Sequence, residues 1–210
     1  MGLNRTLAVF SGVLFLNFKN MNATYTEKNV QFSSLILAPL FLGISTFYWQ
    51  NGEYSANAAT LLILSLFFWI PALQGLFGLL GNMYPRYAAY GSLFALFGCV
   101  SGICFAFLGY LTTIFDIDHQ QYLEALSHYP FSSQLLLFAS GPLFPLSIVV
   151  LGVMLAITKT IPLWQALLFS LAGILFPLSR ITRIQSIAHW ADLLFFIACV
   201  TMALRFFKRP

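Results

Sequence analysis

Residues 90–110, YGSLFALFGCVSGICFAFLGY, contain no charged side chain. As an α-helix this stretch would rise about 30 Å, which matches the thickness of the hydrocarbon core of a bilayer. In lipid every backbone N–H and C=O group needs a partner within the protein, so such a stretch forms a helix or a barrel strand. The stretch lacks the two-residue alternation of barrel strands. It therefore predicts a transmembrane helix.

The rest of the chain has the same character. Of its 210 residues 60% are hydrophobic and 8% are charged, whereas soluble domains carry about 25% charged residues. A soluble domain could not cover its surface with so few ionisable groups, so lipid must surround most of the chain. Six segments are long and apolar enough to cross a bilayer: 31–50, 57–81, 86–115, 132–158, 161–179 and 185–206. The predicted fold class is an all-α integral membrane bundle of six transmembrane helices.

The N-terminal segment differs from these spans. Residues 6–18 are apolar, but as a helix they would reach only about 20 Å, too short to cross the hydrocarbon core. No convincing cleavage site follows, which disfavours a secretory signal peptide. We expect a short extra helix, interfacial or tucked against the bundle, in residues 1–30, followed by a six-helix domain in residues 31–210.

The third span places its small residues on one helix face. Gly91, Ala95, Gly98, Gly102 and Ala106 recur in steps of three or four, and small residues let helices approach closely in lipid. We therefore predict a central helix that packs within the chain. The alternative is that the same face binds a second copy of the chain or a partner helix.

Prolines predict an interruption in the fourth span. The run ASGPLFP, residues 139–145, holds Gly141 and two prolines, and each proline removes an intrahelical hydrogen bond. We expect this span to be discontinuous in its first third.

The two halves of the chain share short matches in the same order. QFSSLIL (31–37) aligns with PFSSQLL (130–136), and GCVS (98–101) aligns with ACVT (198–201). Three spans per half would make the second half cross the membrane in the opposite sense, as in many transporters. Short matches between apolar segments also arise by chance, so a bundle without repeats is the alternative. The hypothetical inverted three-helix repeats are residues 31–115 and 131–208.

Lysine and arginine predict the orientation. If residues 19–30 are cytoplasmic, eight of the ten basic residues lie on the cytoplasmic side and only Arg180 and Arg183 lie outside, in agreement with the positive-inside rule. The C-terminus is then cytoplasmic, and we expect an integral protein of the plasma (inner) membrane. The net charge of +4 is accounted for by topology, and no basic patch indicates nucleic-acid binding.

The candidate site lies in LSRITRIQSIAHWADLLFF, residues 178–196. His189 and Asp192 are three positions apart on one helix face, where they could relay a proton or cation. Arg180 and Arg183 precede them and could neutralise Asp192. Ionisable groups in or near a bilayer are costly and are functional candidates by default. The predicted binding or relay residues are His189, Asp192, Arg180, Arg183 and Gln74. Gln74 is included because it lies three positions after Pro71.

Several functions fit this pattern. The favoured one is a transporter or channel for a small solute or ion, with or without proton coupling, that has no cofactor and no enzymatic activity. In the enzymatic alternative, a membrane-embedded hydrolase would use a divalent metal to act on a lipid-like substrate. Its ligands would come from Asp116, Asp118, His119, His128 and His189. The third hypothesis is a non-catalytic assembly subunit. The simplest interpretation of Asp192 is that it forms a purely structural ion pair.

Overall fold

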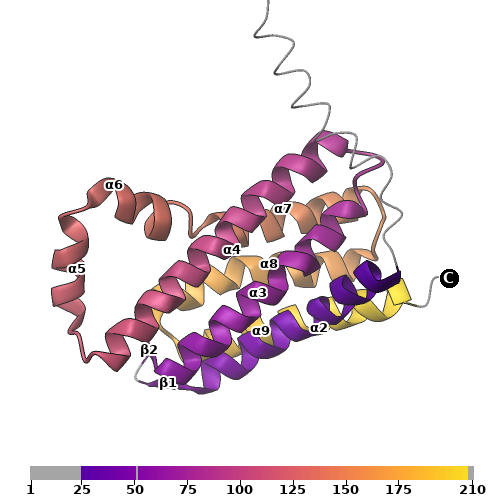
Figure 1. Cartoon of the computed structure of the whole chain (residues 1–210). Coiled ribbons are helices and arrows are strands. Elements are labelled where there is room, and N and C mark those ends of the chain that lie inside the picture. Colours follow the sequence, from indigo (N-terminus) through magenta and orange to yellow (C-terminus); the bar gives the residue numbers. More distant parts are fainter. Residues whose placement is uncertain (1–24, 51, 208–210) are drawn as a thin grey trace, which may run out of the picture.

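The computed structural model describes residues 25–50 and 52–207 (Figure 1). The interfacial or short helix predicted for residues 6–18 lies outside them. Within the described ranges, six helices are long and apolar enough to cross a membrane, and the fourth of them is interrupted. The elements are α2 (Tyr25–Phe47), β1 (Trp49–Gln50), β2 (Glu53–Tyr54), α3 (Ala56–Gly78), α4 (Pro85–Ile114), α5 (His119–Ser127), α6 (Pro130–Ser133), the π-helix η1 (Gln134–Phe138), α7 (Leu143–Ile157), α8 (Leu163–Thr182) and α9 (Gln185–Phe207).

The prediction of an all-α membrane bundle is confirmed by these six helices. One boundary is corrected, because the first helix begins at Tyr25 and not near residue 31. The sequence from Tyr25 to Val30 is polar but contains neither glycine nor proline, so nothing in it ends the helix. The inverted repeat stays a prediction.

The long helices form a closed ring in chain order. α2 packs against α3, α3 against α4, α4 against α7, α7 against α8, α8 against α9, and α9 returns to α2. Aromatic side chains fill the interior: the ring of Trp69 lies 5.6 Å from that of Phe144 and 5.3 Å from that of Phe195. Trp69 and Phe195 are fully buried. Offset and edge-to-face aromatic contacts of this kind stabilise a core beyond the area they bury.

The small residues of α4 pack within the chain. A Cβ atom at Gly98 would lie 2.8 Å from the Cα atom of Phe144, and one at Gly102 would lie 2.8 Å from Cδ1 of Leu66. Such close approach is what small residues permit between helices in lipid. The prediction of intrachain packing is therefore confirmed at these glycines, which lie against α3 and α7, although α4 is one member of the ring and not its centre. Binding of a second copy or a partner helix through α4 stays a prediction. The covered or partly covered positions are Gly91, Gly98, Gly102 and Ala106.

The fourth span is interrupted where the prolines predicted. α6 and η1 precede an irregular segment at residues 139–142, and α7 follows it. Ser101 of α4 donates a hydrogen bond to the Leu136 carbonyl at 2.7 Å, and Ser140 Oγ lies 2.6 Å from the Leu135 carbonyl. Serine hydroxyls thus satisfy carbonyl groups that an interrupted helix leaves free.

Candidate functional site

A two-stranded hairpin closes one end of the bundle, called here the hairpin end. Trp49 pairs with Tyr54 and Gln50 with Glu53 in antiparallel register. Gly52 has a φ of 82°, a conformation that glycine adopts at no steric cost. The hairpin joins α2 to α3, and the segment between α8 and α9 lies against it.

Arg183 fastens the hairpin to that segment. Its Nη1 donates to the Gly52 carbonyl at 3.0 Å and to Glu53 Oε2 at 2.8 Å. Arg183 itself is left-handed, with a φ of 57°, and forms the C-terminal cap of α8. The tight turn between α8 and α9 thereby directs the guanidinium toward the hairpin, where we define the Arg183–Glu53 clamp.

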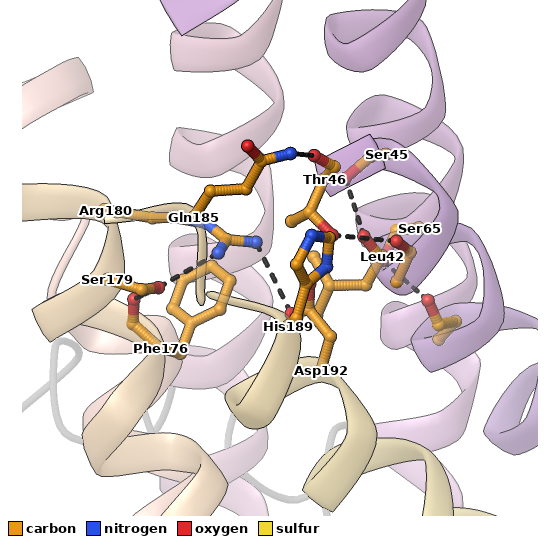
Figure 2. Close-up of polar contacts among 12 residues, drawn as sticks. Leu42, Ser45, Thr46, Ser65, Phe176, Ser179, Arg180, Gln185, His189 and Asp192 are labelled. Carbon is orange, nitrogen blue, oxygen red and sulfur yellow. Dashed lines mark hydrogen bonds and ion pairs between the residues drawn. The ribbon is translucent and has the colours of Figure 1, made fainter. Parts of the chain in front are cut away.

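A second ion pair lies deeper, between α8 and α9. Arg180 Nη2 is 3.5 Å from Asp192 Oδ1, and their side chains are 12% and 2% exposed (Figure 2). Asp192 follows the first residue of α9 by seven positions, which places it about 10 Å along the helix. Both charges therefore belong to helices long enough to span the membrane. The sequence predicted neutralisation of Asp192 by Arg180 or Arg183, and the structure places Arg180 in that position.

Aromatic rings enclose the Arg180 guanidinium. Its Cζ atom lies 4.8 Å from the ring centroid of Trp49 and 4.7 Å from that of Phe176. Ser179 Oγ accepts a hydrogen bond from Nη1 at 3.0 Å. Cation–π contacts strengthen when desolvated, so Trp49 both covers Arg180 and helps to hold it. The first strand of the hairpin therefore covers the buried pair through Trp49.

The buried pair is incompletely hydrogen-bonded. Among the described residues, neither Asp192 Oδ2 nor Arg180 Nε has a hydrogen-bond partner, although both atoms are buried. A buried charge that lacks partners is costly, and few such atoms occur in a native structure. The Thr46 hydroxyl also interacts with the Asp192 carboxyl group, but no well-formed hydrogen bond from the described residues reaches Oδ2, so this oxygen can accept a proton or a cation.

His189 lies beside the pair and contacts α2. Its Nδ1 is 3.1 Å from Thr46 Oγ1, and its ring centroid is 4.5 Å from that of Phe47. Thr46 Oγ1 also donates to the Gly43 carbonyl at 2.8 Å. Since a hydroxyl carries one hydrogen, that bond requires His189 Nδ1 to be the donor to Thr46. Within the described residues no hydrogen bond or ion pair joins His189 directly to Asp192, so a relay between them would need Thr46 or water.

Thr46 is the member of this cluster that the sequence did not single out. It is fully buried, and its carbonyl accepts a hydrogen bond from Gln185 Nε2 at 2.9 Å (Figure 2). A Cβ atom at Gly43 would lie 3.8 Å from the Cβ of Asp192, so α2 passes close to the carboxylate. Two adjacent hydroxyl residues, Ser45 and Thr46, in the last turn of an apolar span were the available signal.

Gln74 does not join the other predicted binding residues. It lies 18 positions beyond the first residue of α3, about 27 Å along the helix from the hairpin end. Its side chain is exposed. The structure therefore separates Gln74 from Arg180, His189 and Asp192.

The residues of the predicted metal site are dispersed. Asp118 is the N-terminal cap of α5 and accepts a hydrogen bond from the Gln120 amide at 2.9 Å, while His128 is the exposed cap at its other end. Asp116 is exposed before α5, and the side chain of His119 lies outside the described ones. Within the described part of the chain, no three His, Cys, Asp or Glu residues are grouped to hold a metal ion.

Burial and nearby charges both shift the pKa values of Tyr54 and Tyr122 at the hairpin end. Burial raises the pKa of Tyr54 above its ordinary value of 10.0, while the positive charges of Arg180 and Arg183 lower it to a smaller extent. Burial likewise raises the pKa of Tyr122, with Arg183 acting in the opposite direction. Tyr54 thus remains a neutral hydroxyl between two guanidinium groups at physiological pH.

Comparison of the chain with models of protein families, with curated proteins and with solved structures finds no match.

Proposed function

We propose that this multi-pass membrane protein is a carrier of a small solute or ion, coupled to protons at Asp192. The observation that carries the proposal is the buried Arg180–Asp192 pair with its unpartnered carboxylate oxygen. A charge within the membrane costs about 2.5–3.5 kcal/mol on insertion scales. A purely structural pair gains most when its remaining hydrogen bonds are made, and this one leaves two atoms without them.

Protonation of Asp192 would act as a switch. Arg180 stays charged at any physiological pH, so the carboxyl group is the member of the pair that titrates. As a carboxylate, Asp192 attracts Arg180 and holds α9 to α8. As a neutral acid it loses most of that attraction, and its hydroxyl becomes a donor to a neighbour. Two protonation states with different contacts between the helices are the element that coupled transport requires.

The filled interior supports a carrier over an open channel. Trp69 and Phe195 are fully buried at the centre of the ring, and their rings touch. A solute could pass only if helices moved relative to one another. The interrupted fourth span, with Ser101 and Ser140 at its break, supplies a place where such movement would cost few helical hydrogen bonds. The inverted repeats remain part of this hypothesis.

The charge distribution supports an orientation with the hairpin end outside. Lys28, Arg86, Lys159 and Arg205 belong to the opposite end of the bundle by their positions in or beside the long helices. Under the positive-inside rule that end faces the cytoplasm. We therefore propose a cytoplasmic C-terminus and, for a protein of this kind, the plasma membrane as its location.

Flux measurements test the proposal. Purified protein would be reconstituted in liposomes that contain the pH dye pyranine, and inorganic cations, amines, amino acids and sugars would be added outside in turn. At least one class should change the internal pH, and Asp192→Asn should abolish that change in protein that is still folded, although its thermal stability falls because Arg180 loses its counter-charge. Asp118→Asn, which removes the same charge from an exposed residue, is the matched control. Flux that survives in Asp192→Asn would refute the role of Asp192.

A further inference from the structure

A pocket of about 310 Å³ opens beside the hairpin. The C-terminal turns of α4, the start of α5 and the second strand of the hairpin form its walls, and Figure 1 shows α5 projecting from the bundle at this end. The pocket is separate from the buried pair, but Tyr54 lines the pocket and also interacts with Arg180. The side chains that matter for its chemistry are Glu53, Tyr54, Phe105, Asp116, Tyr122 and Arg183.

The side chains that line the pocket carry more negative than positive charge. Its single guanidinium, Arg183, already donates to Gly52 and Glu53 and lies 5.9 Å from the ring centroid of Tyr54. Asp116 is exposed and belongs to neither ion pair found among the described residues. Two carboxylates against one engaged guanidinium leave the pocket with a net charge of −1.

The walls of the pocket are aromatic. The ring of Tyr54 meets that of Phe105 edge to face, with centroids 6.4 Å apart, and Tyr122 forms part of the opposite wall. Aromatic faces attract cations, and quaternary ammonium groups are bound in this way in aromatic cages. Carboxylates next to aromatic faces therefore favour a cation that carries apolar groups over an anion or a sugar.

We propose that this pocket binds an organic cation with an apolar body, such as an alkylated amine. The inference rests on the proposed function, since it names the class of solute that the carrier would take. Asp116 provides the counter-charge, and Phe105, Tyr54 and Tyr122 contact the apolar groups. The volume of about 310 Å³ lies at the lower end of the range for ligand pockets, so the solute is small.

Glu53 connects the pocket to the buried pair. It is both a wall of the pocket and the partner of Arg183 in the clamp. A cation that approaches Glu53 competes with Arg183 and so weakens the clamp. The hairpin then releases Trp49 from Arg180, which exposes the buried pair to protons. Binding of the solute is in this way linked to access to Asp192.

Calorimetry with two probes of opposite charge tests the pocket. Benzyltrimethylammonium and phenylmethanesulfonate have similar shapes, and each would be titrated into the protein in dodecyl maltoside, a detergent without charge. We expect heat of binding for the ammonium ion and none for the sulfonate. Asp116→Asn should weaken binding of the ammonium ion about tenfold, whereas Asp118→Asn, with the same change of charge two positions away, should change it less than about twofold. Equal effects of the two substitutions, or binding of the sulfonate, would overturn the proposal.

Two further comparisons distinguish failure of the pocket from failure of the transport function, and a free solute from a lipid headgroup. Because calorimetry needs no gradient, binding without pH-coupled flux would leave the pocket standing and remove the transport function, and coupled flux without binding of the ammonium ion would do the reverse. In nanodiscs, affinity should be the same in phosphatidylcholine and in phosphatidylethanolamine, which has the same net charge of zero but lacks the methylated ammonium group. Weaker binding in phosphatidylcholine would identify a lipid headgroup as the occupant and would overturn the proposal of a free solute.

Discussion

Arg183 Nη1 lies 2.8 Å from Glu53 Oε2, although 130 residues separate the two in the sequence. The contact joins the turn between α8 and α9 to the hairpin between α2 and α3, and so links the first and last parts of the described chain. The Glu53 side chain is 62% exposed, and exposed ion pairs contribute about 0–1 kcal/mol. An ion pair of this strength would allow the hairpin to open, as the proposed access of protons to Asp192 requires.

Loss of the clamp should loosen the hairpin without unfolding the protein. In Glu53→Gln we expect faster hydrogen exchange at Trp49, Gln50 and Tyr54, because Arg183 keeps only its bond to the Gly52 carbonyl. The free energy of unfolding should fall by no more than about 1 kcal/mol. Hydrogen-exchange mass spectrometry and a thermal melt measure the two effects, with Glu124→Gln as a control on exposed α5. Unchanged exchange in the hairpin would contradict the clamp.

The buried pair should be costly to break and less costly to replace. Asp192→Ala leaves Arg180 buried without its counter-charge, and removal of one member of a buried pair costs about 3–5 kcal/mol. The double variant Arg180→Met/Asp192→Leu replaces both charges by apolar side chains and should recover most of that loss. Thermal unfolding in detergent measures both. A double variant no more stable than Asp192→Ala would show that the charges themselves hold α8 to α9.

Transport by the double variant Arg180→Met/Asp192→Leu distinguishes a functional role of the Arg180–Asp192 pair from a structural one. If Arg180 and Asp192 serve only stability, the stable double variant should still move solute. If they couple protons to transport, it should be folded and inactive. Activity in the double variant would therefore support the structural interpretation of Asp192.

The sequence predicted what depends on local patterns and missed what depends on distant contacts. Apolar length predicted the six helices, and the proline run predicted the break at residues 139–142, because both properties belong to single segments. The pairing of His189 with Thr46 spans 143 residues, and that of Arg183 with Glu53 spans 130. No periodicity encodes such contacts, since they follow from closure of the ring between α2 and α9. Gln74 was predicted as a binding residue from its polarity and its position three residues after Pro71, and neither property places it at the end of the bundle that holds Asp192.

Alkaline pH should destabilise the hairpin through Tyr54. Its pKa is raised above 10.0 by burial, so between the unfolded and folded pKa values the unfolded chain releases a proton that the folded chain keeps. Stability from this group is complete below about pH 10 and is lost as pH rises through the folded pKa. Melting temperatures measured from pH 8 to 11 should decline less steeply in Tyr54→Phe. Parallel curves for the two proteins would contradict the burial of this hydroxyl.

Metal content decides the enzymatic alternative. The structure disperses Asp116, Asp118, His128 and His189, so we expect the purified protein to contain no stoichiometric zinc, manganese or iron. Mass spectrometry of the elements in protein purified without chelators is the measurement. About one equivalent of a divalent ion, lost in a variant with His119→Ala, would restore the metal-dependent hydrolase as a candidate.

Gly98 should tolerate no side chain, whereas Gly109 on the same helix should. A Cβ atom at Gly98 would lie 2.8 Å from the Cα atom of Phe144 in α7, and a backbone atom cannot rotate away as a side chain can. A Cβ atom at Gly109 would lie 3.8 Å from the Cβ atom of Tyr54, which is an ordinary van der Waals contact. Gly98→Ala should therefore cost about 1–3 kcal/mol, the usual penalty for overpacking, and Gly109→Ala should cost less than about 0.5 kcal/mol. Thermal unfolding measures both, and light scattering in detergent measures the oligomeric state. A Gly98→Ala protein with unchanged stability but fewer dimers would show that this face binds a second copy of the chain and not α7.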